Sequence, residues 1–113
     1  MRLSLPILLL FALCVPTALA LEPCRQVHGR ARLYTADGQL RIWQIGSHHE
    51  FEPADKASWG KLQNIMLPHG VSGTQYDLYA DFTLCPTKPF KGGSVQPAIV
   101  KGIQHKRLVS WPK

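Results

Sequence analysis

The chain has 113 residues, including three cysteines, and a formal net charge of +6 at pH 7. This length allows one small domain, and the charge is compatible with contact with anionic lipid head groups, wall polymers or acidic proteins, although solubility alone is sufficient reason for it. No nucleic-acid recognition motif is present, so nucleic acid is not an expected partner.

The first twenty residues are typical of a secretory signal peptide. A short positive start precedes an almost wholly apolar stretch at residues 3–15, and Ala-Leu-Ala at 18–20 is the pattern that signal peptidase cleaves. We therefore expect residues 1–20 to be removed and residues 21–113 to form a single small β domain in the periplasm or outside the cell. A retained membrane anchor is the alternative, because the apolar stretch approaches spanning length. Two prolines and the cleavage pattern favour removal, which leaves no stable membrane span.

Two cysteines remain after such a cleavage, Cys24 and Cys85, because Cys14 leaves with the signal peptide. An exported chain meets an oxidising compartment, so we expect a Cys24–Cys85 disulfide. A domain of this size needs such help, since it buries only about 60–65% of its unfolded surface. Free thiols or intermolecular disulfides are the alternative. The spacing of the two cysteines excludes a Cys-x-x-Cys redox site.

Residues 27–46 carry the clearest pattern in the chain, two strands joined by a turn. In the first strand, one face is apolar or small and the other is polar: Val27, Gly29, Ala31 and Leu33 against His28, Arg30, Arg32 and Tyr34. Such alternation predicts a half-buried strand. Gly38 follows Asp37 and favours a turn, because glycine accepts a positive φ. Residues 40–46 are apolar on both faces and predict a more central strand.

The next part of the chain is expected to hold a loop and the single helical candidate. Residues 47–53 are polar and indicate a strand end that runs into a loop. Residues 55–66 predict a helix, with Asp55 as its cap and Pro68 after its end. One face of this helix is apolar: Trp59, Leu62, Ile65 and Met66. Residues 69–75 are typical of an exposed loop.

The last part of the chain predicts three further strands. Residues 76–85 alternate regularly, residues 94–103 are strand-like with Pro97 at an edge or a bulge, and residues 108–111 indicate a short final strand. Short strands separated by glycine and proline turns are typical of all-β folds. We therefore expect a small β-sandwich or barrel with at most one short helix.

The adjacent residues His48, His49 and Glu50 are the first candidates for metal binding. Neighbouring side chains on a strand point to opposite faces, so both histidines could hold one ion only from a loop, with further ligands from histidines elsewhere in the chain. The simpler interpretation is a pair of solvated loop histidines, and no cofactor is expected. For catalysis, Asp77 and Asp81 share a strand face but are too far apart for a glycosidase pair, and no nucleophile motif is present.

A different set of residues is better suited to binding than to chemistry: Arg30, Arg32, Arg41 and Trp43. If the outward faces of the first two strands coincide, the sheet presents arginines beside aromatic rings. Such a surface suits acidic or carbohydrate-like ligands, through bidentate hydrogen bonds and stacking. The simpler interpretation is a basic solvent face with Trp43 in the core.

Three segments resemble a group of small exported bacterial proteins of unassigned function. They are residues 24–30, 41–46 and 81–86, which read Cys-x-x-Val-His-Gly-Arg, Arg-Ile-Trp-x-Ile-Gly and Asp-Phe-x-x-Cys-Pro. In layout, the chain is also similar to the prealbumin-like β-sandwich of carboxypeptidase regulatory domains, although it has Ala-Asp-Phe at 80–82 where those domains often have Gly before the aromatic residue. The first resemblance transfers no catalytic residue. The second implies a non-catalytic protein, because the regulatory domains are mostly non-catalytic accessories.

Together these features predict an exported, non-enzymatic binding or accessory module of the bacterial cell envelope. Its partner would be an envelope protein or an anionic surface component, contacted through the arginines and Trp43. The alternative is a small metal-dependent or hydrolytic enzyme that uses the segment His48-His49-Glu50. An inhibitor of a partner enzyme would have the same sequence features as the first hypothesis.

Overall fold

The computed structural model describes residues 22–34, 38–67 and 75–110. The predicted signal peptide and most of the predicted loop after α1 lie outside these residues. The elements are β1 (Arg25–Tyr34), β2 (Gln39–Gln44), β3 (Glu50–Pro53), α1 (Lys56–Met66), β4 (Tyr76–Pro86) and β5 (Gln96–Ser110). Within the described residues, none of the helices has the length and hydrophobicity needed to span a bilayer.

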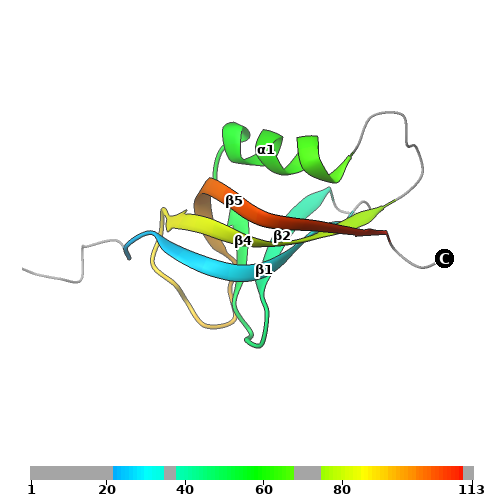
Figure 1. The fold of residues 1–113 in the computed structure, drawn as a ribbon. Coiled ribbons are helices and arrows are strands. Elements are labelled where there is room, and N and C mark those ends of the chain that lie inside the picture. Colours follow the sequence, from blue (N-terminus) through cyan, green and yellow to red (C-terminus); the bar gives the residue numbers. More distant parts are fainter. Residues whose placement is uncertain (1–21, 35–37, 68–74, 111–113) are drawn as a thin grey trace, which may run out of the picture.

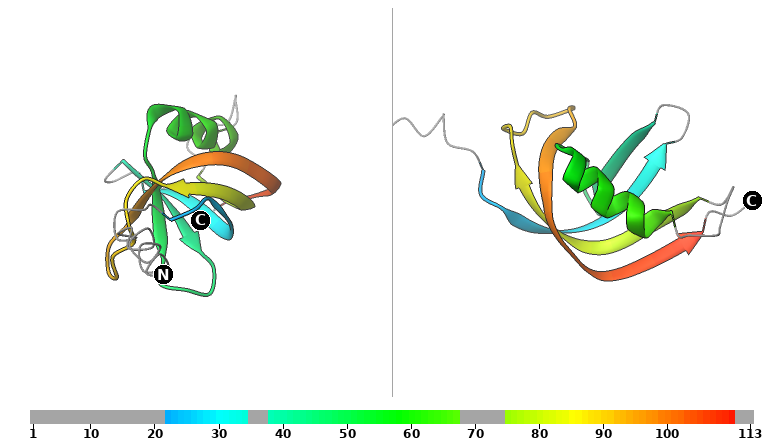
Figure 2. Two further views of the ribbon diagram at one scale, coloured as in Figure 1. Left: turned by 90° about the vertical axis from the view of Figure 1, so that its left-hand side faces the viewer. Right: turned by 90° about the horizontal axis from the view of Figure 1, so that it is seen from above.

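The five strands close into a barrel in the order β1-β2-β3-β5-β4, and α1 lies across it (Figures 1 and 2). All neighbouring strands are antiparallel except β3 and β5, which are parallel. Of the two architectures that the sequence allows, the sandwich and the barrel, the chain therefore forms the barrel. This strand order, with a helix between β3 and β4, is the connectivity of the OB-fold.

The barrel interior is filled by the alternating apolar residues of the strands, as the sequence predicts. The buried core comprises Val27, Ala31, Leu40, Ile42, Phe51, Leu62, Met66, Leu78, Ala80, Phe82, Leu84, Ala98 and Val100. Gly29 is required where β1 crosses β2, because a Cβ atom there would lie 3.0 Å from both Ile42 Cγ2 and the Trp43 carbonyl oxygen. The close approach of β1 to β2 thus depends on a residue without a side chain.

The helix forms as predicted and packs against one side of the barrel. Asp55 caps it, with Oδ1 accepting a hydrogen bond from the Ser58 amide at 2.9 Å. The hydroxyl of Ser58, which is buried, accepts a hydrogen bond from the Val100 amide at 2.8 Å, and Lys61 Nζ donates to the Val100 carbonyl at 3.0 Å. These two contacts connect α1 to β5.

The expected loop at residues 47–53 is wrong in its second half, because Glu50–Pro53 form β3. Phe51 and Pro53 point inward and are buried, whereas the two glutamates are half-buried on the outside. Four residues with a terminal proline give too short an alternation to indicate a strand. Phe51 of β3 pairs in parallel with Gln96 of β5. This pairing between distant parts of the chain exists only in the closed barrel.

The predicted break between residues 103 and 108 is also wrong, because β5 is one strand of 15 residues. The polar residues 104–107 obscure the pattern since this half of β5 is exposed on both faces. The pairing of β5 with β4 is also irregular in this region, where the register shifts opposite residues 104–107. His105, within this region, has a positive φ of 56°. Pro97, predicted at an edge or a bulge, occupies the second position of the strand, opposite Glu52.

The predicted disulfide is confirmed. Cys24 precedes β1 and is bonded to Cys85 near the end of β4, across 61 positions of sequence. The bond lies at the end of the β1–β4 ladder, where Arg25 pairs with Leu84. It therefore fixes the N-terminal end of the barrel covalently.

Candidate binding surface

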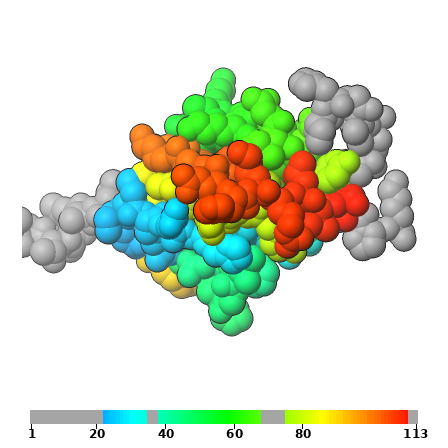
Figure 3. Space-filling view, viewed as in Figure 1, coloured from blue at the N-terminus to red at the C-terminus, as the bar shows by residue number. Residues whose placement is uncertain are grey.

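One row of outward side chains crosses all five strands of the barrel. The strand registers place these residues next to one another: Glu50 on β3, Trp43 on β2, Arg30 on β1, Tyr79 on β4 and Arg107 on β5. We call this set the cross-strand row. The outward faces of β1 and β2 therefore coincide, which is the condition under which the sequence predicts a basic and aromatic surface. In Figure 3, β1 (blue), β4 and β5 (orange to red) lie side by side on the visible face.

Both arginines of the cross-strand row lie over aromatic rings. The Cζ atom of Arg30 is 4.9 Å from the centre of the Trp43 ring, and that of Arg107 is 4.8 Å from the centre of the Tyr79 ring. Within the described residues, neither guanidinium has a carboxylate partner, and the buried Nε of Arg30 has no hydrogen-bond partner. The rings hold the two cations in place while leaving donors available to a ligand.

Trp43 is not in the core, contrary to the simpler interpretation of the sequence. It is half-buried on the outer face, and its indole Nε1 donates a hydrogen bond to the Ser47 carbonyl at 2.8 Å. This bond fixes the orientation of the indole ring under Arg30. The tryptophan acts as a platform on the outside of the barrel rather than as a core residue.

Arg32 and Asp77 make the strongest charged contact on the same face. Arg32 Nε and Nη2 donate to the two carboxylate oxygens of Asp77 at 2.8 and 2.6 Å. Asp77 is buried, with 6% of its surface exposed. The hydrogen bonds to Asp77 raise the pKa of the Arg32 guanidinium. Arg32, one of the predicted binding residues, is therefore held in an ion pair within the fold.

Beside the cross-strand row, two histidines share one carboxylate. Nδ1 of His28 and Nδ1 of His105 lie 2.9 and 2.8 Å from the two oxygens of Asp81. An ionised carboxylate only accepts hydrogen bonds, so both Nδ1 atoms carry the hydrogen. The bonds from His28 and then His105 lower the pKa of Asp81. The sequence indicates Asp81 only as an outward residue, because its partners lie 53 and 24 positions away.

The fourth predicted binding residue, Arg41, lies in an open hollow at one end of β1 and β2. The hollow has a volume of about 210 Å³ and is lined by Tyr34, Gln39, Arg41 and Glu50. Arg41 Nη2 donates to Gln39 Oε1, and Nη1 lies 3.6 Å from a carboxylate oxygen of Glu50. The buried Nε of Arg41 has no hydrogen-bond partner within the described residues. The sequence gives no direct signal for this hollow.

The side chains of the metal-binding candidates His48, His49 and Glu50 lie in different surroundings. His48 is exposed, Glu50 faces Arg41 on the outer surface, and His49 is half-buried. In the part of the chain that the structure describes, there is no group of three or more His, Cys, Asp or Glu residues placed to hold a metal ion. His49 and Glu50 thus make separate contacts, and His48 is exposed.

His49 attaches the connection between β4 and β5 to the barrel. Its ring is stacked between Phe51, at 4.3 Å between ring centres, and Phe90, at 3.8 Å. Nε2 lies 2.8 Å from Gln96 Oε1, and Nδ1 lies 3.2 Å from an Arg25 nitrogen. Because Arg25 can only donate, Nδ1 accepts and Nε2 carries the hydrogen. Both ring nitrogens are therefore engaged, which explains the position of His49 without a metal.

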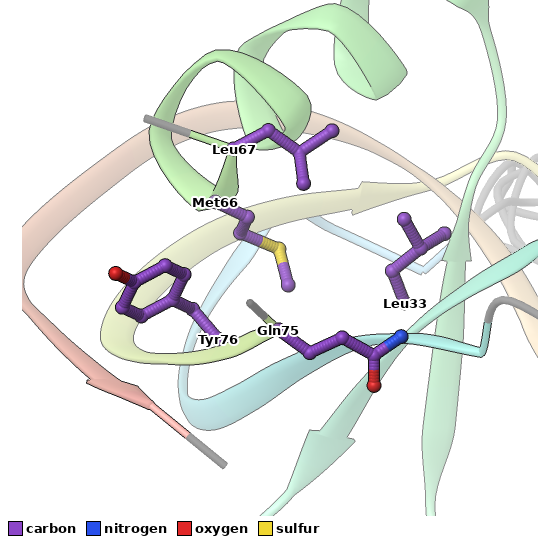
Figure 4. Close-up of a pocket in the computed structure, with 5 residues that line it drawn as sticks. All are labelled: Leu33, Met66, Leu67, Gln75 and Tyr76. Carbon is purple, nitrogen blue, oxygen red and sulfur yellow. The ribbon is translucent and has the colours of Figure 1, made fainter. Parts of the chain in front are cut away.

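A small apolar pocket lies below the end of α1 (Figure 4). Its lining residues are Leu33, Met66, Leu67, Gln75 and Tyr76, and its volume is about 30 Å³. This is the space of about one water molecule. We interpret it as a packing gap between the helix and the barrel.

Comparison of the chain with family models, with curated proteins and with solved structures gives no match. The resemblances noted in the sequence therefore stay predictions. Fold and surface together describe a small disulfide-closed barrel with a basic, aromatic outer face.

Proposed function

We propose that the protein is an exported, non-enzymatic binding module that contacts an anionic component of the cell envelope. The contact surface is the outer face of the barrel around the cross-strand row. The fold by itself implies no function, so the proposal rests on the chemistry of this surface.

The observation that carries the proposal is the pair of guanidiniums over aromatic rings, Arg30 over Trp43 and Arg107 over Tyr79. Nearby charges are already matched, since Arg32 pairs with Asp77. Arg30 and Arg107 have no carboxylate partner among the described residues and are therefore the cations of the row that can attract an anionic partner. Because the rings restrict their motion, less side-chain entropy is lost when a ligand binds.

Two features support export. The N-terminal sequence has the charge, apolar stretch and cleavage pattern of a signal peptide. The Cys24–Cys85 bond is a structural disulfide, and such bonds form and persist mainly in oxidising compartments. Removal of residues 1–20 takes away Arg2 and no acidic residue, so the exported chain keeps a charge of about +5, which favours association with the anionic surfaces found there.

The test is retention of the mature, oxidised protein on envelope fractions of the source organism. The variant carries both Arg30→Gln and Arg107→Gln, which remove the two cations of the cross-strand row and leave the Arg32–Asp77 pair intact. We expect this variant to bind at least about tenfold more weakly, because each lost charged hydrogen bond is worth about 1.5–3 kcal/mol.

The matched control carries Lys56→Gln and Lys88→Gln. It removes the same number of charges from exposed positions at the start of α1 and between β4 and β5, outside the cross-strand row. We expect the control to bind within about twofold of the wild type. Equal losses in both variants would mean that net charge alone governs binding, and the proposal would be abandoned.

A further inference from the structure

We propose that the hollow lined by Tyr34, Gln39, Arg41 and Glu50 is a subsite for one sugar ring, and that the anionic component is an acidic glycan. This inference rests on the proposed function, because the same outer face must bind the rest of the glycan. It assigns a role to the hollow that the cross-strand row does not explain.

The size of the hollow suits a single ring. Its volume of about 210 Å³ is below the range of about 300–1,000 Å³ that is usual for sites of drug-sized ligands. Tyr34 lines it with 36% of its surface exposed, so part of this aromatic side chain is available to a ligand. A sugar presents C–H groups on one face and hydroxyl groups around its rim, which is the pattern that an aromatic ring with polar neighbours accommodates.

The polar groups of the hollow can form hydrogen bonds with hydroxyl groups. Gln39 and Glu50 supply acceptors, and the guanidinium of Arg41, which lines the hollow beside them, supplies donors. A hydroxyl group can donate and accept at once, so one sugar can satisfy both kinds of group. A phosphate group fits less well, because it would lie against the carboxylate of Glu50.

The hollow is continuous with the cross-strand row. Glu50 belongs to both, and Arg41 lies two residues before Trp43 on β2, which places their backbones about 7 Å apart on the same face. A chain with one ring in the hollow would therefore run directly onto the platform that Trp43 and Arg30 form.

The spacing of the free cations suits an extended glycan. Arg30 leans over Trp43 on β2 and Arg107 leans over Tyr79 on β4, so the guanidiniums are displaced in the same direction. The two strands are separated by β1, which gives a spacing of about 10 Å from the usual distance between strands. That is close to the length of a disaccharide, so the cations can bind carboxylates that recur once per two sugars.

The experiment compares two anionic probes by isothermal titration calorimetry on the mature, oxidised protein. Hyaluronan oligosaccharides carry one carboxylate per disaccharide, and poly-L-glutamate carries carboxylates without sugar rings. We expect Tyr34→Ala and Glu50→Gln each to weaken hyaluronan binding about tenfold while leaving poly-L-glutamate binding within about twofold. Because Glu50→Gln makes the face more positive, its loss of glycan affinity cannot come from weaker attraction to an anion.

Tyr34→Phe is the conservative control, since it keeps the ring, and we expect it to bind hyaluronan within about twofold of the wild type. The sugar subsite would be overturned if Tyr34→Ala and Glu50→Gln weakened the binding of both probes equally. It would also be overturned if they weakened the binding of neither probe. The double variant Arg30→Gln with Arg107→Gln should weaken both probes. If this double variant binds both probes as tightly as the wild type does, the proposed function is wrong. If the double variant loses binding while the Tyr34 and Glu50 variants do not, only the sugar subsite is wrong.

Discussion

Arg32 and Asp77 form a bidentate ion pair that joins β1 to β4, with one of the two hydrogen bonds at 2.6 Å. Asp77 is almost completely buried beneath the longer arginine side chain, which is itself about one quarter exposed. The pair lies on the same face as the cross-strand row. Its hydrogen bonds distinguish Arg32, which is paired within the protein, from Arg30 and Arg107, which are available to a ligand.

Removal of one partner should therefore destabilise the fold. We expect Asp77→Ala to lower the free energy of unfolding by about 3 kcal/mol, because Arg32 loses its carboxylate partner in a partly buried site. Urea denaturation followed by circular dichroism measures this. Arg30→Ala on the same strand is the control, and we expect it to cost less than about 1 kcal/mol. A similar loss in both variants would contradict the distinction between the two arginines.

The Cys24–Cys85 bond should contribute strongly to stability. It closes a loop across 61 positions, for which the chain-entropy model gives about 4 kcal/mol. We expect the double variant Cys24→Ser with Cys85→Ser to lose about 2–5 kcal/mol in denaturant unfolding. Reduction of the wild-type protein should give the same loss. An unchanged unfolding midpoint would show that the ladder between β1 and β4 holds this end of the barrel without the bond.

Asp81 should make stability depend on pH in the acid range. Its pKa is lowered in the folded protein by hydrogen bonds from His28 and His105. A carboxyl group with a lowered folded pKa stabilises the fold above its unfolded pKa of about 3.9, and that contribution is lost as pH falls through the folded pKa. Urea midpoints measured from pH 6 downward should fall more steeply for the wild type than for Asp81→Asn. Parallel curves would contradict this role of Asp81.

Two glycines give a matched pair of backbone predictions. A Cβ atom at Gly29 would lie 3.0 Å from β2, whereas nothing lies within 4 Å of a Cβ atom at Gly60 in α1. We expect Gly29→Ala to cost about 1–3 kcal/mol through overpacking. Gly60→Ala should add up to about 1 kcal/mol, because alanine favours the helix. Thermal melts of both variants provide the test, and a stable Gly29→Ala protein would mean that β1 can move away from β2.

Much of the fold follows from local sequence. The alternation in β1 and β4 predicts which residues face the core, because successive side chains of a strand point to opposite sides. Asp55 and the apolar face of residues 59–66 predict α1 for the same kind of local reason, and the cysteine count predicts the disulfide. These features depend on neighbouring residues or on a small number of possible pairs.

The binding surface depends instead on which strands become neighbours. The cross-strand row joins residues from β3, β2, β1, β4 and β5, and the order and register of these strands make them neighbours. The short strand β3, the shared carboxylate of Asp81 and the hollow at Arg41 arise in the same way. Sequence determined the strands, the helix and the composition of each face. Tertiary structure decided which outward side chains meet, because contacts between distant residues depend on strand order and register rather than on local pattern.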